Sequence, residues 1–123
     1  MPQSTTAQVR MLLDLSGGRW TLPVLDSLQP GPVRFGTIRR SLPGIAQKQL
    51  THTLRQLERG GFVLRTAYPT IPPRVEYDLT DLGRELATRL ASIGRFAIER
   101  RSETESAQRR FDSTMGSSDQ PSP

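Results

Sequence analysis

The chain has 123 residues, of which 34% are hydrophobic and 24% are charged, so it has enough apolar material for one modest core and a single domain. Its net charge is +5, and it contains no cysteine and one histidine, which excludes disulfides, cysteine nucleophiles, thiolate metal sites and multi-histidine zinc sites. No apolar run is long enough to span a membrane and no secretory signal is visible, so we expect a cytoplasmic protein without cofactor or metal.

Two helices are predicted in the first quarter of the chain. Thr5 and Gln8 have the spacing of a capping box, and the apolar face that follows predicts a helix over about residues 5–15. A glycine pair ends this helix. A second helix is predicted over about residues 20–28, where Pro23 is tolerated because it falls in the first turn.

The next two predicted helices are separated by a tight turn. Phe35, Ile38 and Leu42 have the spacing of a short third helix, which Pro43–Gly44 ends. A fourth helix is predicted over about residues 46–59 and is closed by another glycine pair.

The remaining elements are a hairpin, a long helix and a tail. Alternating and β-branched residues predict a β-hairpin over about residues 62–79, with a proline-rich loop at 69–73. Thr80 is a suitable cap for a last helix over about residues 81–102, which carries a continuous apolar stripe. The domain is predicted to extend over residues 1–111, and the polar composition of residues 112–123 predicts a disordered tail.

The helix predicted over residues 46–59 has two opposed faces. At 100° per residue, Leu50, Leu54 and Leu57 fall within roughly 60° of one another and predict the buried side. Gln47 and Thr51 lie near its N-terminal end, where amides and hydroxyls suit base edges and phosphates. The opposite side carries four polar or basic side chains, which are Lys48, His52, Arg55 and Arg59.

Basic residues are concentrated in the middle of the chain. Residues 34–74 hold eight of the 17 basic residues and one of the 12 acidic residues, a net charge of +7 that leaves −2 elsewhere. This distribution is typical of a polyanion-binding element on a scaffold. The alternative is an ordinary solvated surface, because charge alone does not separate the two readings.

The order of the elements favours a nucleic-acid-binding fold. A short helix, a turn, a polar helix and a hairpin predict a winged helix-turn-helix, a mostly helical α+β fold with flanking helices at both ends. The partner would be double-stranded DNA, read by the fourth helix in the major groove. Arg39 and Arg40 lie near the turn and Arg74 lies at the foot of the hairpin loop, where each would contact phosphates.

Three stretches of this sequence resemble one family of regulators. They are GGRWTL at residues 17–22, GPVRFGTIRRSLPGIAQKQLTHTLRQLERGGFV at residues 31–63 and YPTIPPRVEYDLTDLG at residues 68–83. Together they are similar to the HxlR family of bacterial transcription regulators. The resemblance runs from about Leu15 to Gly83, more than half of the chain, and continues weakly through the last helix.

The resemblance implies a homodimeric, winged-helix DNA-binding repressor or activator. It also implies that Gln47, Lys48, Thr51 and Arg55 face the groove, in a helix that starts at Ala46, where the family often carries serine. Many relatives carry a cysteine before the Gly-Gly-Trp segment that senses oxidants or electrophiles. This chain has no cysteine, so any signal it receives must be of another kind.

A second copy of the chain is the expected partner of the flanking helices. A domain of this size cannot bury both the first apolar face and the long stripe of the last helix, so we expect a homodimer and an inverted-repeat operator. A small-molecule effector is possible, but no ligand residues can be assigned from the sequence. The competing interpretations are a protein-interaction module that binds an acidic partner, and an enzyme, for which no nucleophile or base cluster is present.

Overall fold

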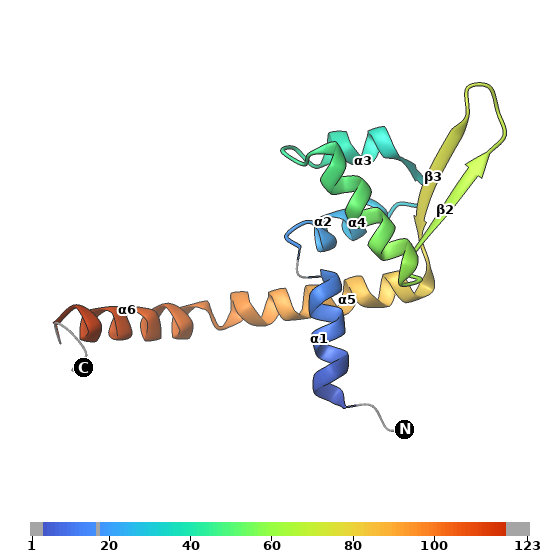
Figure 1. The fold of residues 1–123 in the computed structure, drawn as a ribbon. Coiled ribbons are helices and arrows are strands. Elements are labelled where there is room, and N and C mark those ends of the chain that lie inside the picture. Colours follow the sequence, from blue (N-terminus) through green and yellow to red (C-terminus); the bar gives the residue numbers. More distant parts are fainter. Residues whose placement is uncertain (1–3, 17, 118–123) are drawn as a thin grey trace. The chain divides into compact units, whose positions relative to one another are not determined.

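The computed structural model describes residues 4–16 and 18–117 (Figure 1). These residues form a mostly helical structure with one small antiparallel sheet, as the sequence predicts. They fall into two compact units, divided between Leu90 and Ala91. In chain order the elements are α1 (Thr5–Ser16), α2 (Thr21–Ser27), β1 (Val33–Arg34), α3 (Phe35–Ser41), α4 (Gln47–Arg59), β2 (Val63–Tyr68), β3 (Arg74–Leu79), α5 (Asp81–Glu99) and α6 (Arg101–Ser117).

The core of the first unit lies between α2, α3 and α4. Leu50, Leu54 and Leu57 of α4 are all at most 1% exposed, which confirms the buried side that their spacing predicts. Each fully buried leucine stabilises the fold by about 1.5–3 kcal/mol relative to an exposed one. The fully buried side chains that these leucines join from the other two helices are Val24, Leu25, Leu28 and Ile38.

The first helix is capped one residue earlier than the sequence predicts. Ser4 Oγ accepts a hydrogen bond from the backbone N–H of Ala7 at 3.2 Å, and the Gln8 N–H donates to the Ser4 carbonyl at 3.1 Å. Ser4 therefore takes the capping position that the sequence assigned to Thr5, because either hydroxyl residue fits an N-cap.

The sheet has the strand order β1–β3–β2, with all neighbours antiparallel. The predicted hairpin is confirmed, and its register runs from Val63 opposite Leu79 to Tyr68 opposite Arg74. The strand β1 was not predicted, because its two residues are too few to show an alternating pattern. This strand places Val33–Arg34 beside the middle of β3, and the outer end of the hairpin projects beyond the helices (Figure 1).

Phe62 joins three elements at one point. Its N–H donates to the Leu57 carbonyl at the end of α4 at 2.9 Å, and its carbonyl accepts from the Thr80 N–H at 3.1 Å. Thr80 Oγ1 donates to the Gly61 carbonyl at 2.6 Å and accepts from the Gly83 N–H at 3.0 Å, so Thr80 caps α5 as the sequence predicts. The C-terminal end of α4, the base of the hairpin and the start of α5 are therefore fixed to one another.

The second unit holds the rest of α5 and the whole of α6. The last predicted helix, expected to end near Ser102, stops at Glu99 and is followed by α6 (Arg101–Ser117). Residues 112–117 are helical, whereas their composition predicted disorder. They continue a helix that begins with better helix formers at 101–111, and no proline interrupts them. The rest of the predicted tail, residues 118–123, lies outside the described residues.

We predict that Gly83→Ala destabilises the protein by about 1–3 kcal/mol, because a methyl group at this position would overlap the backbone carbonyl of Phe62. Gly94→Ala on the same helix is the matched control, since nothing lies within 4 Å of its methyl position. This control should be neutral or stabilising by up to about 1 kcal/mol, the gain in helix propensity. Urea denaturation followed by circular dichroism measures both changes, and equal stabilities of the two variants would contradict the close approach at Phe62.

Candidate nucleic-acid interface

A tight turn separates α3 from α4. The short helix α3 ends at Ser41 with Leu42 as its C-cap, and the turn passes through Gly44, whose φ of +90° is a backbone conformation that glycine adopts at little cost. The N-cap of α4 is Ala46, in extended conformation and without a side-chain cap. The first N–H groups of α4 therefore point outward without a hydroxyl or carboxylate acceptor on the cap, an arrangement that favours an anion such as phosphate.

The outer face of α4 consists of Lys48, His52, Arg55 and Arg59. All four residues are exposed, on the opposite side of the helix from Leu50, Leu54 and Leu57. In the described part of the chain, none of the four takes part in an ion pair. The three basic side chains of this face are therefore available to an anionic partner.

Arg55 shares a hollow with a second arginine that sequence reasoning did not assign. This Arg55–Arg65 hollow has a volume of about 320 Å³ and lies between α4 and the hairpin. No ion pair joins either arginine to Glu58, which also borders it, within the described residues. The remaining lining residues are Thr51 and Tyr77.

Arg65 was counted in the basic segment but not placed at the site. Its strand pairs Arg65 with Tyr77, and this register brings it to the same side of the sheet as α4's Arg55. Alternation along residues 62–68 is the signal that would have found it, but the sequence fixes neither the register nor which face meets α4. Two guanidinium groups, a hydroxyl and a phenol around one hollow match the donors that bind a phosphate oxygen.

The turn arginines are linked to the start of α4. Arg39 Nη1 donates to Gln47 Oε1 at 3.3 Å, so the end of α3 and the first turn of α4 are joined by a side-chain hydrogen bond. Arg40 Nη2 donates to Thr37 Oγ1 at 3.2 Å within α3. Both arginines are exposed. The hydrogen bond from Arg39 places Gln47 beside the end of α3.

Arg74 is held against its own hairpin. Its guanidinium lies 4.2 Å from the centroid of the Tyr68 ring, and its Nε is 3.4 Å from Glu76 Oε2. A cation over an aromatic face and a neighbouring carboxylate both restrain the side chain. The guanidinium is thus fixed at the foot of the loop, whose tip is closed by a hydrogen bond from Thr70 Oγ1 to the Pro72 carbonyl at 2.8 Å.

His52 and Arg59 lie toward the other flank of α4. They border a second hollow, which faces α1, together with Gln49 and Gln56. The predicted site residues are therefore not one continuous cluster. Thr51 and Arg55 lie toward the hairpin, His52 lies toward α1, and Lys48 lies between the two flanks on the outer face.

The arrangement is that of a helix-turn-helix followed by a wing, which is the β2–β3 hairpin. A family model described as HxlR-like helix-turn-helix matches residues 15–105. This match covers most of the chain. The protein belongs to the HxlR-like helix-turn-helix family.

The curated relatives are named as HTH-type transcriptional regulators. One from Methanothermobacter thermautotrophicus is 45% identical over 78 residues, which cover 63% of this chain and 60% of that protein. The YtfH regulator of Escherichia coli K12 is 41% identical over 75 residues, covering 61% of this chain and 60% of that protein. The matched part of the chain thus spans about 60% of the length of these relatives.

Solved structures share the fold over most of the chain. A MarR-family transcriptional regulator from Enterococcus faecalis V583 has a TM-score of 0.74 and 33% identity, covering 85% of this chain and 96% of that one. The redox regulator HypR in its reduced form has a TM-score of 0.69 and 37% identity, covering 80% and 98%. The 123-residue sequence contains no cysteine, so it holds no thiol for redox chemistry.

No helix in the described ranges is long and apolar enough to cross a membrane.

We predict that Lys48→Ala and Arg55→Ala each weaken binding to a specific duplex by roughly 1–3 kcal/mol, because each removes a charged donor from the outer face of α4. Both residues are exposed, so stability should change by no more than about 0.5 kcal/mol. Arg89→Ala on α5 removes the same charge away from this face and serves as the control. Fluorescence anisotropy with labelled duplex measures the affinities, and unchanged binding by both variants would place the interface elsewhere.

Proposed function

We propose that this protein is a transcriptional regulator that binds duplex DNA with α4 in the major groove. The observation that carries the proposal is the outer face of α4, where three cations that form no ion pair with any described residue lie opposite the fully buried leucines of the same helix. The wing beside it supplies a second contact with the same duplex. Family membership supports this assignment, because the relatives are named as transcriptional regulators.

We assign some side chains of α3, α4 and the wing to base edges and others to phosphates. Gln47, Lys48 and Thr51, on the first turns of α4, are the residues we assign to base edges, where amides and cations pair with purines. The Arg55–Arg65 hollow takes a backbone phosphate, and His52 makes a further contact from the flank of the outer face that lies toward α1. The phosphate contacts on either side of the groove come from Arg39 and Arg40 of α3 and from Arg74 of the wing.

Exposed apolar side chains support the assignment of a homodimer. On α1, Val9 is 48% and Leu13 59% exposed, and on the C-terminal unit Ile93 and Phe96 are 63% and 64% exposed. Large side chains at such positions are usually buried against another chain. A twofold dimer would carry two α4 helices about 34 Å apart, or a multiple of this, and would bind an inverted repeat.

Binding to the DNA upstream of the protein's own coding sequence tests the function directly. In a gel-shift series with random duplex as competitor, we expect that DNA to be retained at competitor levels that remove random sequence. Equal affinity for both, together with a co-purifying acidic protein, would favour the protein-interaction module instead.

We predict that the salt dependence of the DNA association constant gives the number of phosphates that the protein neutralises. The logarithm of the association constant should fall with the logarithm of salt concentration by about 0.9 per neutralised phosphate. Arg65→Ala and Arg55→Ala should each reduce this slope, by at most about 1, because both arginines border the one hollow that takes a phosphate. Arg89→Ala should leave the slope unchanged, and a slope unaffected by Arg65→Ala would remove the wing strand from the interface.

We predict that Leu13→Glu and Phe96→Glu each convert a dimer into a monomer at micromolar concentration. A buried unpaired carboxylate costs several kcal/mol at an interface but little at a site that is exposed in the isolated chain. Sedimentation equilibrium measures the mass, and binding to an inverted repeat should fall to the affinity for one half-site. Dimers that persist in both variants would assign the interface to other surfaces.

A further inference from the structure

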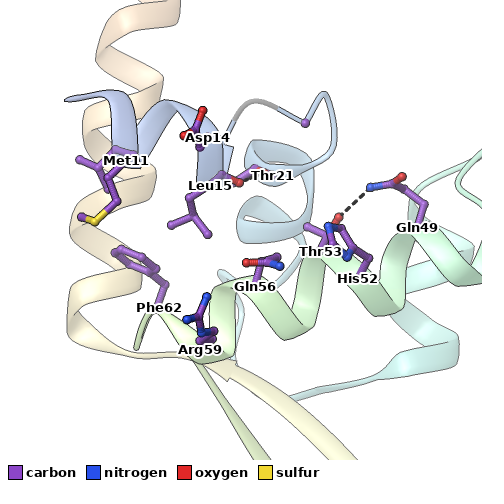
Figure 2. A pocket seen from close by; sticks show the side chains of 13 residues that line it. Met11, Asp14, Leu15, Thr21, Gln49, His52, Thr53, Gln56, Arg59 and Phe62 are labelled. Atoms are coloured by element: carbon purple, nitrogen blue, oxygen red, sulfur yellow. Dashed lines mark hydrogen bonds between the residues drawn. The ribbon is translucent and has the colours of Figure 1, made fainter. Parts of the chain in front are cut away.

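A second hollow lies on the flank of α4 away from the wing, between α4 and α1 (Figure 2). This α1–α4 groove has a volume of about 770 Å³, within the range of roughly 300–1,000 Å³ that small-molecule sites occupy. All of its lining residues belong to the first unit. The proposed function uses His52 and Arg59 of this lining only through the outer face of α4 and gives the rest of the groove no role.

The groove has an apolar wall and a polar wall. Met11 and Leu15 of α1 and Phe62 form the apolar wall, and Figure 2 shows these side chains gathered on one side. The polar wall consists of side chains from successive turns of α4, namely Gln49, His52, Gln56 and Arg59.

The hydroxyl groups on the floor of the groove already form hydrogen bonds within the protein. Thr21 and Thr53 are 3% and 6% exposed, and their hydroxyls are used by the protein itself. Thr21 Oγ1 donates to the Leu15 carbonyl at 3.4 Å, and Thr53 Oγ1 accepts from Gln49 Nε2 at 3.2 Å. A ligand would therefore be oriented by the donors of the polar wall rather than by the floor.

Arg59 gives the groove its charge preference. It forms no ion pair within the described ranges. The one acidic residue of the lining, Asp14, lies on α1, and in Figure 2 its carboxylate points away from Arg59. A free guanidinium beside an apolar wall selects a ligand that combines a flat apolar body with an anionic group, because guanidinium and carboxylate pair with two parallel hydrogen bonds.

We propose that the α1–α4 groove binds a small aromatic carboxylate that regulates DNA binding. The ring lies against Met11, Leu15 and Phe62, where sulfur–aromatic and ring–ring contacts are favourable, and the carboxylate pairs with Arg59. A second copy of the chain is a poorer occupant, since an apolar helix would bury the amides and the guanidinium of the polar wall without partners.

The regulatory part of the proposal rests on the proposed function. His52 and Arg59 belong both to the groove and to the outer face of α4, so a bound carboxylate withdraws a cation from the DNA and adds negative charge beside it. The ligand therefore lowers the affinity for DNA. By linkage, DNA lowers the affinity for the ligand by the same factor, which we expect to be about 5–10-fold.

The probe for the test is 2-naphthoate, with 2-naphthalenemethanol as its uncharged analogue. Binding to the full chain without DNA is followed by isothermal titration calorimetry, and the fluorescence of Trp20, the only tryptophan, gives a second readout because the adjacent Thr21 lines the groove. We expect 2-naphthoate to bind at least fivefold more tightly than the alcohol. No binding at millimolar concentration, or equal binding of both compounds, overturns the proposal.

Two matched variants locate the site. Arg59→Gln and Arg55→Gln remove the same charge from α4, but Arg59 borders the α1–α4 groove while Arg55 borders the hollow beside the wing. Arg59→Gln should weaken 2-naphthoate at least fivefold and leave the alcohol unchanged, whereas Arg55→Gln should change neither. Equal effects of the two variants would mean that the naphthoate responds to general charge and not to this site.

A third variant separates the ligand from a second copy. Met11 is 58% exposed, so Met11→Trp should fill the groove without disturbing the core and should weaken both compounds. If Met11→Trp instead abolishes self-association and leaves ligand binding intact, the groove is an interface between copies and the proposal fails. In the wild-type chain, ligand binding that leaves the DNA affinity unchanged overturns the regulatory part alone, while absence of specific DNA binding overturns the proposed function and leaves the ligand site standing.

Discussion

The structure depends on the hydrogen bonds that meet at Phe62. The Phe62 N–H donates to the Leu57 carbonyl at the end of α4, and the Phe62 carbonyl accepts from the Thr80 N–H at the beginning of α5. Phe62 also directly precedes the wing. Because Gly83 has no side chain, α5 can approach the Phe62 carbonyl closely. The angle between α4 and the wing is therefore set by backbone groups rather than by long side chains. Backbone hydrogen bonds at a buried point tolerate little variation, because an unpaired group there costs about 1–3 kcal/mol. This rigidity holds the two halves of the interface in one relative position.

Sequence reasoning was most successful where one helix carries two opposed patterns. The buried side of α4, formed by Leu50, Leu54 and Leu57, was predicted from spacing alone and is fully buried. The proline and glycine residues correctly located the turn before α4 and the loop of the wing. It missed β1, because two residues show no period, and it missed Arg65, because the side of a strand that meets a helix depends on register in three dimensions. It also predicted disorder at 112–117 from composition, whereas a helix already formed continues at low cost through residues of modest propensity.

The two flanks of α4 differ in what they can recognise. The flank toward the wing has two arginines, a hydroxyl and a phenol around a small polar hollow, while the flank toward α1 has amides and one arginine opposite apolar side chains. Polar side chains distributed around one helix thus belong to separate sites, although in the sequence they form one stripe. Arg59 borders the α1–α4 groove and also belongs to the outer face of α4, so in our proposal a ligand in the groove changes the charge that the outer face offers to DNA.

Because β1 is only two residues long, the wing differs in stiffness along its length. Strand β1 pairs only with Glu76 and Tyr77 of β3, so the middle of the wing is three strands wide, and the two rungs toward the tip, at Val75 and Arg74, are a two-stranded ribbon. Two-stranded ribbons twist more strongly than wider sheets and are marginally stable alone, so these outer rungs exchange their amide hydrogens faster than the middle rungs. The outer wing is therefore more compliant than the three-stranded middle, which in the proposed DNA complex lets it follow grooves of different width while the stacking of Arg74 on Tyr68 keeps its charge in position.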